Sequence, residues 1–188
     1  MKKFWSILLT ITVVLYLAAT VVFTIFHQQF KRLNLKDDVK SSNCILVYNP
    51  ENDKELLQEA KQQLDKNPKS KLIYSPFVVN SNINSLKLLK EEKINKSQVI
   101  PEYYSTSMKS SSKYVADIMH QHNMNNCIIV GRDYEMKRLV ETFEKNNPLF
   151  EFYHKSVQLN GKSYLETTKG RKKAEHELWQ YPKLWLNR

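Results

Sequence analysis

The sequence predicts an α/β domain, a three-layer α/β/α sandwich with a mostly parallel sheet of about five strands, preceded by one transmembrane helix. Three observations predict this architecture. Short apolar runs rich in β-branched residues alternate with segments that have helical periodicity. Each helical segment is long enough to carry the chain back over a sheet, so consecutive strands should run parallel with right-handed crossovers. A long apolar segment at the N-terminus stands apart from this alternation.

The N-terminal segment from Phe4 to Phe26 contains no charged residue. At ~1.5 Å per residue it is long enough to cross a hydrocarbon core of ~30 Å. A cleaved signal peptide is the alternative, but its apolar region is usually ~7–15 residues and ends at small residues, whereas Ala18-Ala19 lie within this run. We predict a short tail over residues 1–3, a membrane anchor over 4–26 and a linker over 27–43.

The charges that flank the anchor support two opposite orientations in the membrane. Lys2 and Lys3 lie on one side, and Lys31, Arg32, Lys36 and Lys40 on the other, a count that slightly favours a cytoplasmic domain. A first anchor with a short basic N-terminus, however, usually leaves that terminus inside. We therefore expect a cell-membrane protein whose C-terminal domain, residues 44–188, is extracytoplasmic.

The first half of the domain is predicted as strand, helix and strand. Cys44–Tyr48 forms the first strand, and Asn49-Pro50 ends it. A helix follows from residue 51 or 52 to about residue 65, because four apolar residues share one face. They are Leu56, Leu57, Ala60 and Leu64. The second strand covers 71–75 and stops at Pro76.

The next two predicted helices flank a short third strand, Val99-Ile100. Asn82 or Asn84 caps the first of them, and Ser107 or Ser110 the second. The inward residues are Ile83, Leu86 and Leu89 in the first helix and Tyr114, Val115, Ile118 and Met119 in the second. A fifth strand is predicted over residues 150–153.

The fourth strand, Cys127–Val130, leads into a densely charged loop. Gly131 is expected to end the strand, and Asp133 to cap a helix with apolar positions at Met136, Leu139, Val140 and Phe143. The charged residues of the loop are Arg132, Asp133, Glu135, Lys137 and Arg138. In an open α/β sheet, ligands bind in loops of this kind, at the carboxyl ends of the strands.

This strand, loop and helix resemble the YdcF/SanA-like family of bacterial envelope-associated proteins, which carry a domain of unknown function. The family typically shows Thr-Ser-x-x-His-Met-x-Arg after a strand. Asp133-Tyr134, Met136 and Arg138 match this pattern, while Gly131-Arg132 replaces the small polar pair. Glu135 stands where the family has histidine.

A second match lies upstream and is similar to the family's strand ending in Glu-x-x-Ser. Glu102 and Ser105 match, but Met108 and Ser111 stand where threonine and asparagine are expected. The resemblance covers roughly residues 44–154. It implies the fold, an anchored domain facing the outside and a role in the cell envelope.

Polar side chains after the third and fourth strands form the candidate cleft, on the expectation that the two loops adjoin. Glu135 can exchange a proton only if its pKa is raised, and we expect Arg132 and Arg138 to lower it, so that an ion pair is the simpler account. The serines are equally explained as helix caps. The candidate ligand-binding residues are Glu102, Ser105, Ser107, Ser111, Arg132, Asp133, Glu135 and Arg138.

Several site classes are disfavoured. The chain has only three glycines, and prolines follow its first two strands, whereas dinucleotide and P-loop sites need glycines there. No metal site is predicted, because His120 and His122 point to different faces of a helix. No nucleophile motif is present. The cofactor, if any, is left open.

Charge and cysteine content limit the partners. Of the net charge of +10, residues 1–40 carry four and the rest of the chain carries six. This surplus on the domain predicts a solvated surface that would also attract anionic lipids or acidic wall polymers. Nucleic acid is disfavoured, because no basic-aromatic recognition motif is present. The two cysteines, Cys44 and Cys127, are predicted to be buried free thiols.

The C-terminal segment begins with a basic run, residues 169–173, followed by apolar and aromatic residues over 174–185. It forms either a terminal helix packed on the domain or a segment that touches the membrane surface. Pro182 argues against a long amphipathic helix.

Two classes of function remain. The first is a membrane-anchored domain that binds or scaffolds cell-wall or lipid-linked envelope components through an eroded cleft. The alternative is an enzyme that acts on an envelope carbohydrate or a lipid-linked cell-wall precursor. A cytoplasm-facing domain that binds a nucleotide-like cofactor is a distant third.

Overall fold

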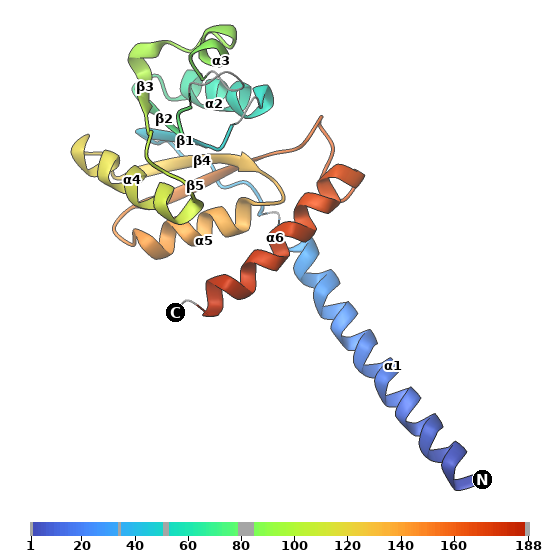
Figure 1. Ribbon diagram of the computed structural model, residues 1–188. Coiled ribbons are helices and arrows are strands. Elements are labelled where there is room, and N and C mark those ends of the chain that lie inside the picture. The colour runs from blue at the N-terminus through green and yellow to red at the C-terminus, as the bar shows by residue number, and fades with distance from the viewer. Residues whose placement is uncertain (1, 34, 51–52, 79–84, 187–188) are drawn as a thin grey trace. The chain divides into compact units, whose positions relative to one another are not determined.

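The computed structural model describes residues 2–33, 35–50, 53–78 and 85–186, and it divides into an N-terminal unit, Met1–Arg32, and a domain, Leu33–Arg188 (Figure 1). Helix α1 (Lys2–Lys31) forms the first unit. Its segment Leu9–Lys31, of 23 residues with mean hydropathy 2.3, is long and apolar enough to cross a membrane.

The sheet of the domain has five strands, and every pairing is parallel. Their order is β3-β2-β1-β4-β5, so the chain moves outward from β1 to β3 and then returns to the other side of β1. This order is Rossmann-like, and it puts the reversal point between β1 and β4. The strands are β1 (Cys44–Tyr48), β2 (Lys71–Ser75), β3 (Val99–Pro101), β4 (Asn126–Arg132) and β5 (Glu151–Val157).

Helices cover both faces of the sheet, which confirms the predicted three-layer sandwich (Figure 1). Ile45 and Val47 of β1 pack into one apolar core with α2, and Leu46 into the other with α5. A strand buried on both faces explains the continuous apolar run of β1. The helices of the domain are α2 (Lys54–Lys66), α3 (Ser85–Glu91), α4 (Met108–Gln121), α5 (Met136–Asn146) and α6 (Thr168–Leu186), with a 3₁₀ turn at Lys96–Gln98.

Helix α2 begins after the cap Asp53, whose carboxylate accepts a hydrogen bond from the backbone of Leu56 at 3.3 Å. Its start predicted at 51 or 52 lies outside the described residues. In α4, Ser107 is the N-cap and forms a capping box with Ser110, as the sequence predicts. Tyr114 is 39% exposed, so its predicted inward position is wrong.

Helix α3 differs from its prediction. Leu86 is 41% exposed, because the buried side chains follow an i, i+3, i+4 pattern that begins at Ser85 and continues with Leu88 and Leu89. The residues predicted as caps, Asn82 and Asn84, and the predicted inward Ile83 lie outside the described residues.

The stretch predicted as a polar linker is in part structured. Helix α1 continues to Lys31, and Asp38 exchanges two backbone hydrogen bonds of 3.1 and 2.8 Å with His154 of β5. The carboxylate of Asp37 accepts a hydrogen bond from the backbone of Ser156 at 2.8 Å. The linker therefore protects the edge of the sheet that β5 would otherwise expose.

Glycine 131 lies inside β4 and does not end the strand as expected. A Cβ atom at this position would lie 2.8 Å from Cδ2 of Leu139, so the glycine allows α5 to approach the strand closely. Near the start of β4, Cys127 is buried beside Cys44, and both are free thiols as predicted. Burial and the neighbouring Cys44 raise the pKa of the Cys127 thiol.

Helix α6 begins at Thr168 and includes the basic run 169–173 and Pro182. Ala174 is fully buried, whereas Trp179 is 70% exposed. The side chains of Tyr181, Leu184 and Trp185, which the sequence places on the same helix, lie outside those described. The first half of α6 is thus packed on the domain, and Trp179 remains in solvent.

Candidate functional site

The order of the sheet divides the predicted cleft into two groups of residues. Strands β2 and β1 lie between β3 and β4, so the expectation that the third and fourth loops adjoin is wrong. One group follows β2 and β3, and the other follows β4. A pattern of alternating strands and helices is compatible with several strand orders, and the sequence did not distinguish them.

The first group is a serine–glutamate cluster, defined here as Ser75, Glu102, Ser105 and Ser111. The Glu102 carboxylate accepts hydrogen bonds from the backbone N–H groups of Tyr104 and Ser105, at 2.6 and 2.9 Å, and from the Ser75 hydroxyl at 2.7 Å. The hydroxyls of Ser75 and Ser111 are 2.6 Å apart. Of the predicted cleft residues, Glu102, Ser105 and Ser111 therefore come together.

The serine–glutamate cluster is buried, since Ser75 and Ser111 are 0% and Glu102 2% exposed. Three donors from the chain itself satisfy the Glu102 carboxylate, which fixes the loop after β3. Ser107 is exposed and caps α4 from outside the cluster. We conclude that this cluster positions the loop and does not offer a reactive hydroxyl to a substrate.

The second group begins with Arg132, at the end of β4. Its guanidinium donates two hydrogen bonds to the Asp53 carboxylate, from Nε to Oδ2 at 2.7 Å and from Nη2 to Oδ1. It also forms an ion pair with Glu55 at 2.7 Å. It also donates to the carbonyl oxygen of Gln158 at 2.7 Å. Because Asp53 follows β1, the Arg132–Asp53–Glu55 cluster lies across the reversal point of the sheet.

Only 4% of Arg132 is exposed. Burial by itself would lower the pKa of its guanidinium, but the hydrogen bonds with Asp53 and Glu55 outweigh that effect and raise the pKa. The arginine is therefore a permanently charged, paired group. It closes the position where a fold of this class commonly receives its ligand.

Asp133 is fully buried, and its role differs from the predicted helix cap. Its carboxylate accepts hydrogen bonds from the backbone of Tyr134 at 2.9 Å and of Tyr164 at 3.0 Å. Helix α5 starts later, and the residue at its N-cap position, Glu135, makes no side-chain cap bond. Burial raises the pKa of Asp133, although both backbone donors lower it. Asp133 thus holds the segment that leads into α6.

Glu135 is partly buried, and its environment contradicts the expected lowering of its pKa. Burial, followed by the nearby Glu177 carboxylate, raises the pKa of Glu135 to about 7. Arg132, Arg138 and Lys173 oppose this shift without cancelling it. The arginines do not neutralise Glu135, because each forms its ion pairs with other carboxylates.

The partner of Arg138 is Glu177 of α6, at 2.9 Å between Nη2 and Oε1, and Glu177 is only 7% exposed. From the same helix, Lys173 donates to the Tyr134 hydroxyl at 3.1 Å. Glu135 therefore lies among groups that α5 and α6 contribute jointly. A carboxyl group that exchanges protons near neutral pH is a candidate general acid or base.

Sequence reasoning missed the acidic partners of both arginines. Asp53 and Glu55 belong to the start of α2, and Glu177 to a helix near the C-terminus. A signal for Glu177 was present, because an acidic residue shares the buried helical face with Ala174 and so requires a cation. No comparable signal marked Asp53.

An open pocket of about 510 Å³ lies beside β5 and contains none of the predicted candidates. The linker contributes Lys36 and Asp37, helix α2 contributes Glu55 and Glu59, and β5 contributes Lys155 among others. Asp37 and Lys155 pair with each other across it. Charges of both signs line the pocket, so it does not favour an anionic or a cationic ligand.

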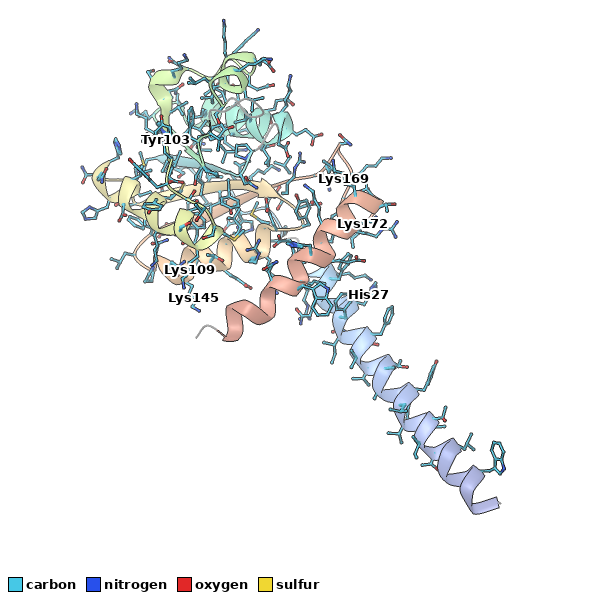
Figure 2. The ribbon with its side chains drawn as sticks, viewed as in Figure 1. His27, Tyr103, Lys109, Lys145, Lys169 and Lys172 are labelled. Carbon is cyan, nitrogen blue, oxygen red and sulfur yellow. The ribbon has the colours of Figure 1, made fainter. Side chains whose placement is uncertain are left out.

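Two tyrosines form an exposed aromatic platform just after β3. Tyr103 is 58% and Tyr104 74% exposed. Tyr103 packs edge-on against Phe77 at 5.4 Å between ring centroids, and Tyr104 lies 5.7 Å from Tyr114. Figure 2 shows Tyr103 on the outside of the domain. Each ring is thus held by a second aromatic side chain while it remains open to solvent.

Within the described ranges, no three His, Cys, Asp or Glu side chains gather as a metal site would require. Comparison of the chain with protein-family models and with curated proteins gives no match.

Proposed function

We propose that the chain is a single-pass protein of the bacterial cell membrane whose α/β domain lies outside the cytoplasm and binds cell-envelope components. The proposal combines the apolar helix α1 with the resemblance to YdcF/SanA-like proteins. One observation favours binding over catalysis. Arg132, with Asp53 and Glu55, occupies the reversal point between β1 and β4, where related architectures bind substrates and cofactors.

A ligand that entered at this point would have to separate a buried arginine from two carboxylates. Removing one partner of a buried ion pair is costly, at about 3–5 kcal/mol, because the other charge is left uncompensated. Binding at the surface requires no such separation. The tyrosine platform, Tyr103 and Tyr104, is the surface best prepared for it, since both rings are exposed and held in place.

A wall polysaccharide matches the chemistry of the tyrosine platform. The apolar faces of sugar rings pack on aromatic rings, and polar side chains nearby bind hydroxyl groups. Thr106 and Ser107, the second and third residues after Tyr104, are exposed. We therefore assign the envelope component to the carbohydrate class.

Sedimentation of the full chain, in detergent micelles, with purified cell-wall sacculi tests the proposal. Tyr103→Ala/Tyr104→Ala should weaken binding about tenfold, since two aromatic contacts each contribute about 0.5–1.5 kcal/mol. Leu149→Ala, which removes a side chain that is 92% exposed, serves as the control and should bind like wild type. No sedimentation of the wild-type protein would contradict the proposal.

The side of the membrane is tested separately. A reporter that is active only outside the cytoplasm, fused after Arg188, should be active, and a cytoplasm-active reporter should not. The reverse result would refute the extracytoplasmic domain and would make an intracellular ligand the first one to seek.

The second candidate is an enzyme acting on an envelope carbohydrate or a lipid-linked precursor, and Glu135 favours it. A partly buried carboxyl with a pKa of about 7 could donate or accept a proton at neutral pH. Glu135→Gln keeps the shape and removes the proton exchange. If an enzyme is present, this variant should fail to complement a strain that lacks the protein, although it folds. Full complementation would exclude this candidate.

A further inference from the structure

Helix α6 has two distinct faces. The buried face consists of Gly170, Ala174 and Glu177, at i, i+4 and i+7. Four exposed residues, which we call the α6 stripe, follow the opposite face at i, i+3, i+7 and i+10. They are Lys169, Lys172, His176 and Trp179. Figure 2 shows both lysines projecting from α6 into solvent.

The orientation of α6 is fixed by close contacts on its buried face. A Cβ atom at Gly170 would lie 2.6 Å from Cα of Tyr164, so the helix approaches the preceding backbone as closely as a glycine allows. Glu177 is held by Arg138 at 2.9 Å. Because these contacts determine the rotation of the helix about its axis, the α6 stripe must face away from the domain.

The same contacts connect α6 to the point where the chain enters the domain. The backbone N–H of Lys137 donates to the carbonyl oxygen of Leu33 at 3.1 Å, and the next residue, Arg138, binds Glu177. Leu33 is the second residue after the last residue of α1. Two residues of chain reach about 7 Å at most. The domain surface around Leu33 is therefore tethered close to any bilayer that α1 spans.

We propose that α6 binds the bilayer surface, with Lys169 and Lys172 on anionic lipid headgroups and Trp179 in the interfacial layer. A lysine near an anionic surface contributes about 1 kcal/mol, and tryptophan prefers the interface between headgroups and hydrocarbon. The domain already covers the other face of the helix, so charge attraction provides most of the binding. This inference depends on the proposed membrane anchoring but not on glycan binding.

Tryptophan quenching in lipid nanodiscs tests the inference on the full chain. The chain has three tryptophans, and Trp5→Phe/Trp185→Phe leaves Trp179 as the only one. Brominated lipids should quench Trp179 strongly in discs that contain phosphatidylglycerol and weakly in purely zwitterionic discs. Salt at about 0.5 M should reduce the quenching, because it screens interactions between exposed charges.

Charge reversal supplies the matched comparison. In the same background, Lys169→Glu/Lys172→Glu should lower the fraction of lipid-bound Trp179 at least tenfold in anionic discs. Lys93→Glu/Lys96→Glu changes the net charge equally at exposed positions near β3 and should leave quenching unchanged. Equal unfolding midpoints for the two variants would show that both fold.

The outcomes separate this inference from the proposed function. Equal Trp179 quenching in anionic and zwitterionic discs, or equal loss in both charge variants, would overturn the inference. Either result would leave the proposed glycan binding by Tyr103 and Tyr104 open to its own test, sedimentation with sacculi. A chain that does not insert into discs would instead refute the membrane anchor, and with it both proposals.

Discussion

Arg132 and Asp53 are 79 residues apart in sequence, yet their side chains form a two-bond ion pair across the carboxyl ends of β4 and β1. Glu55 completes the charge balance at 2.7 Å. In this architecture ligands usually bind at the reversal point of the strand order, which here lies between β1 and β4. Here the protein fills it with its own charged groups, which connects the fold directly to the proposal that binding occurs elsewhere.

We expect Arg132→Met to lower the free energy of unfolding by about 3 kcal/mol, the low end of the range for a buried ion pair, because the side chains of Asp53 and Glu55 are 21% and 34% exposed. The midpoint of thermal unfolding in micelles should fall by about 5–10 °C. Lys61→Met is the control, since Lys61 pairs with Asp65 on the exposed face of α2 and such pairs contribute little. Equal midpoints for both variants would show that the Arg132 ion pairs do not stabilise the fold.

Glu135 should make stability depend on pH in the direction opposite to that of an ordinary salt-bridged acid. Its pKa is raised from 4.5 to about 7 by folding, so between these values the folded state binds more protons than the unfolded state. The free energy of unfolding therefore falls as pH rises through this window. At pH 8, the ionised Glu135 side chain should lower the free energy of unfolding by about 2 kcal/mol. This value already includes a reduction for the partial exposure of the side chain to solvent.

Glu135→Gln removes this loss, so the variant should unfold at a higher temperature than wild type at pH 8 and at nearly the same temperature at pH 5. Glu144→Gln, on an exposed position of the same helix, should show no such crossover. If Glu135→Gln were destabilised equally at both pH values, its carboxyl would have an ordinary pKa or a structural bond would have been lost.

The two buried glycines should tolerate a methyl group differently. At Gly170 the added Cβ would lie 2.6 Å from a backbone atom of Tyr164, whereas at Gly131 the nearest atom, at 2.8 Å, is the end of the Leu139 side chain. Because a side chain can rotate and a backbone cannot, Gly170→Ala should cost about 3 kcal/mol and Gly131→Ala about 1 kcal/mol. Urea unfolding of both variants measures the difference, and the reverse order would contradict the packing of α6.

Cys44 and Cys127 should be inert toward thiol reagents in the folded protein, because both are buried and the pKa of Cys127 is raised. Mass spectrometry after maleimide treatment should show no adduct on wild type and two after denaturation in guanidinium. Leu149→Cys, at a 92% exposed position, should gain one adduct at once. Rapid labelling of the wild-type protein would mean that the start of β1 or β4 opens readily.

The candidate site was only partly predictable. The sequence identified Arg132, Asp133, Glu135 and Arg138 as a charged group at the end of a strand. The first three lie at or just after the end of β4, and Arg138 lies in the first turn of α5. It did not identify Asp53 and Glu177 as their partners, since these belong to distant elements. The sequence predicts a lowered pKa for Glu135, because two arginines are close to it along the chain, but in the structure these arginines pair with other carboxylates.

Local pattern alone determined the strands, the apolar faces of α2 and α5 and the helix that can span a membrane. Each of these depends on side chains a few residues apart, and periodic burial records that arrangement in the sequence. The tertiary structure alone decided the order β3-β2-β1-β4-β5 and the carboxylate that each arginine binds. Strand order and ion pairs both depend on which remote segments come together in space. The energy of an ion pair is set by the distance between its two charges and not by their separation along the chain.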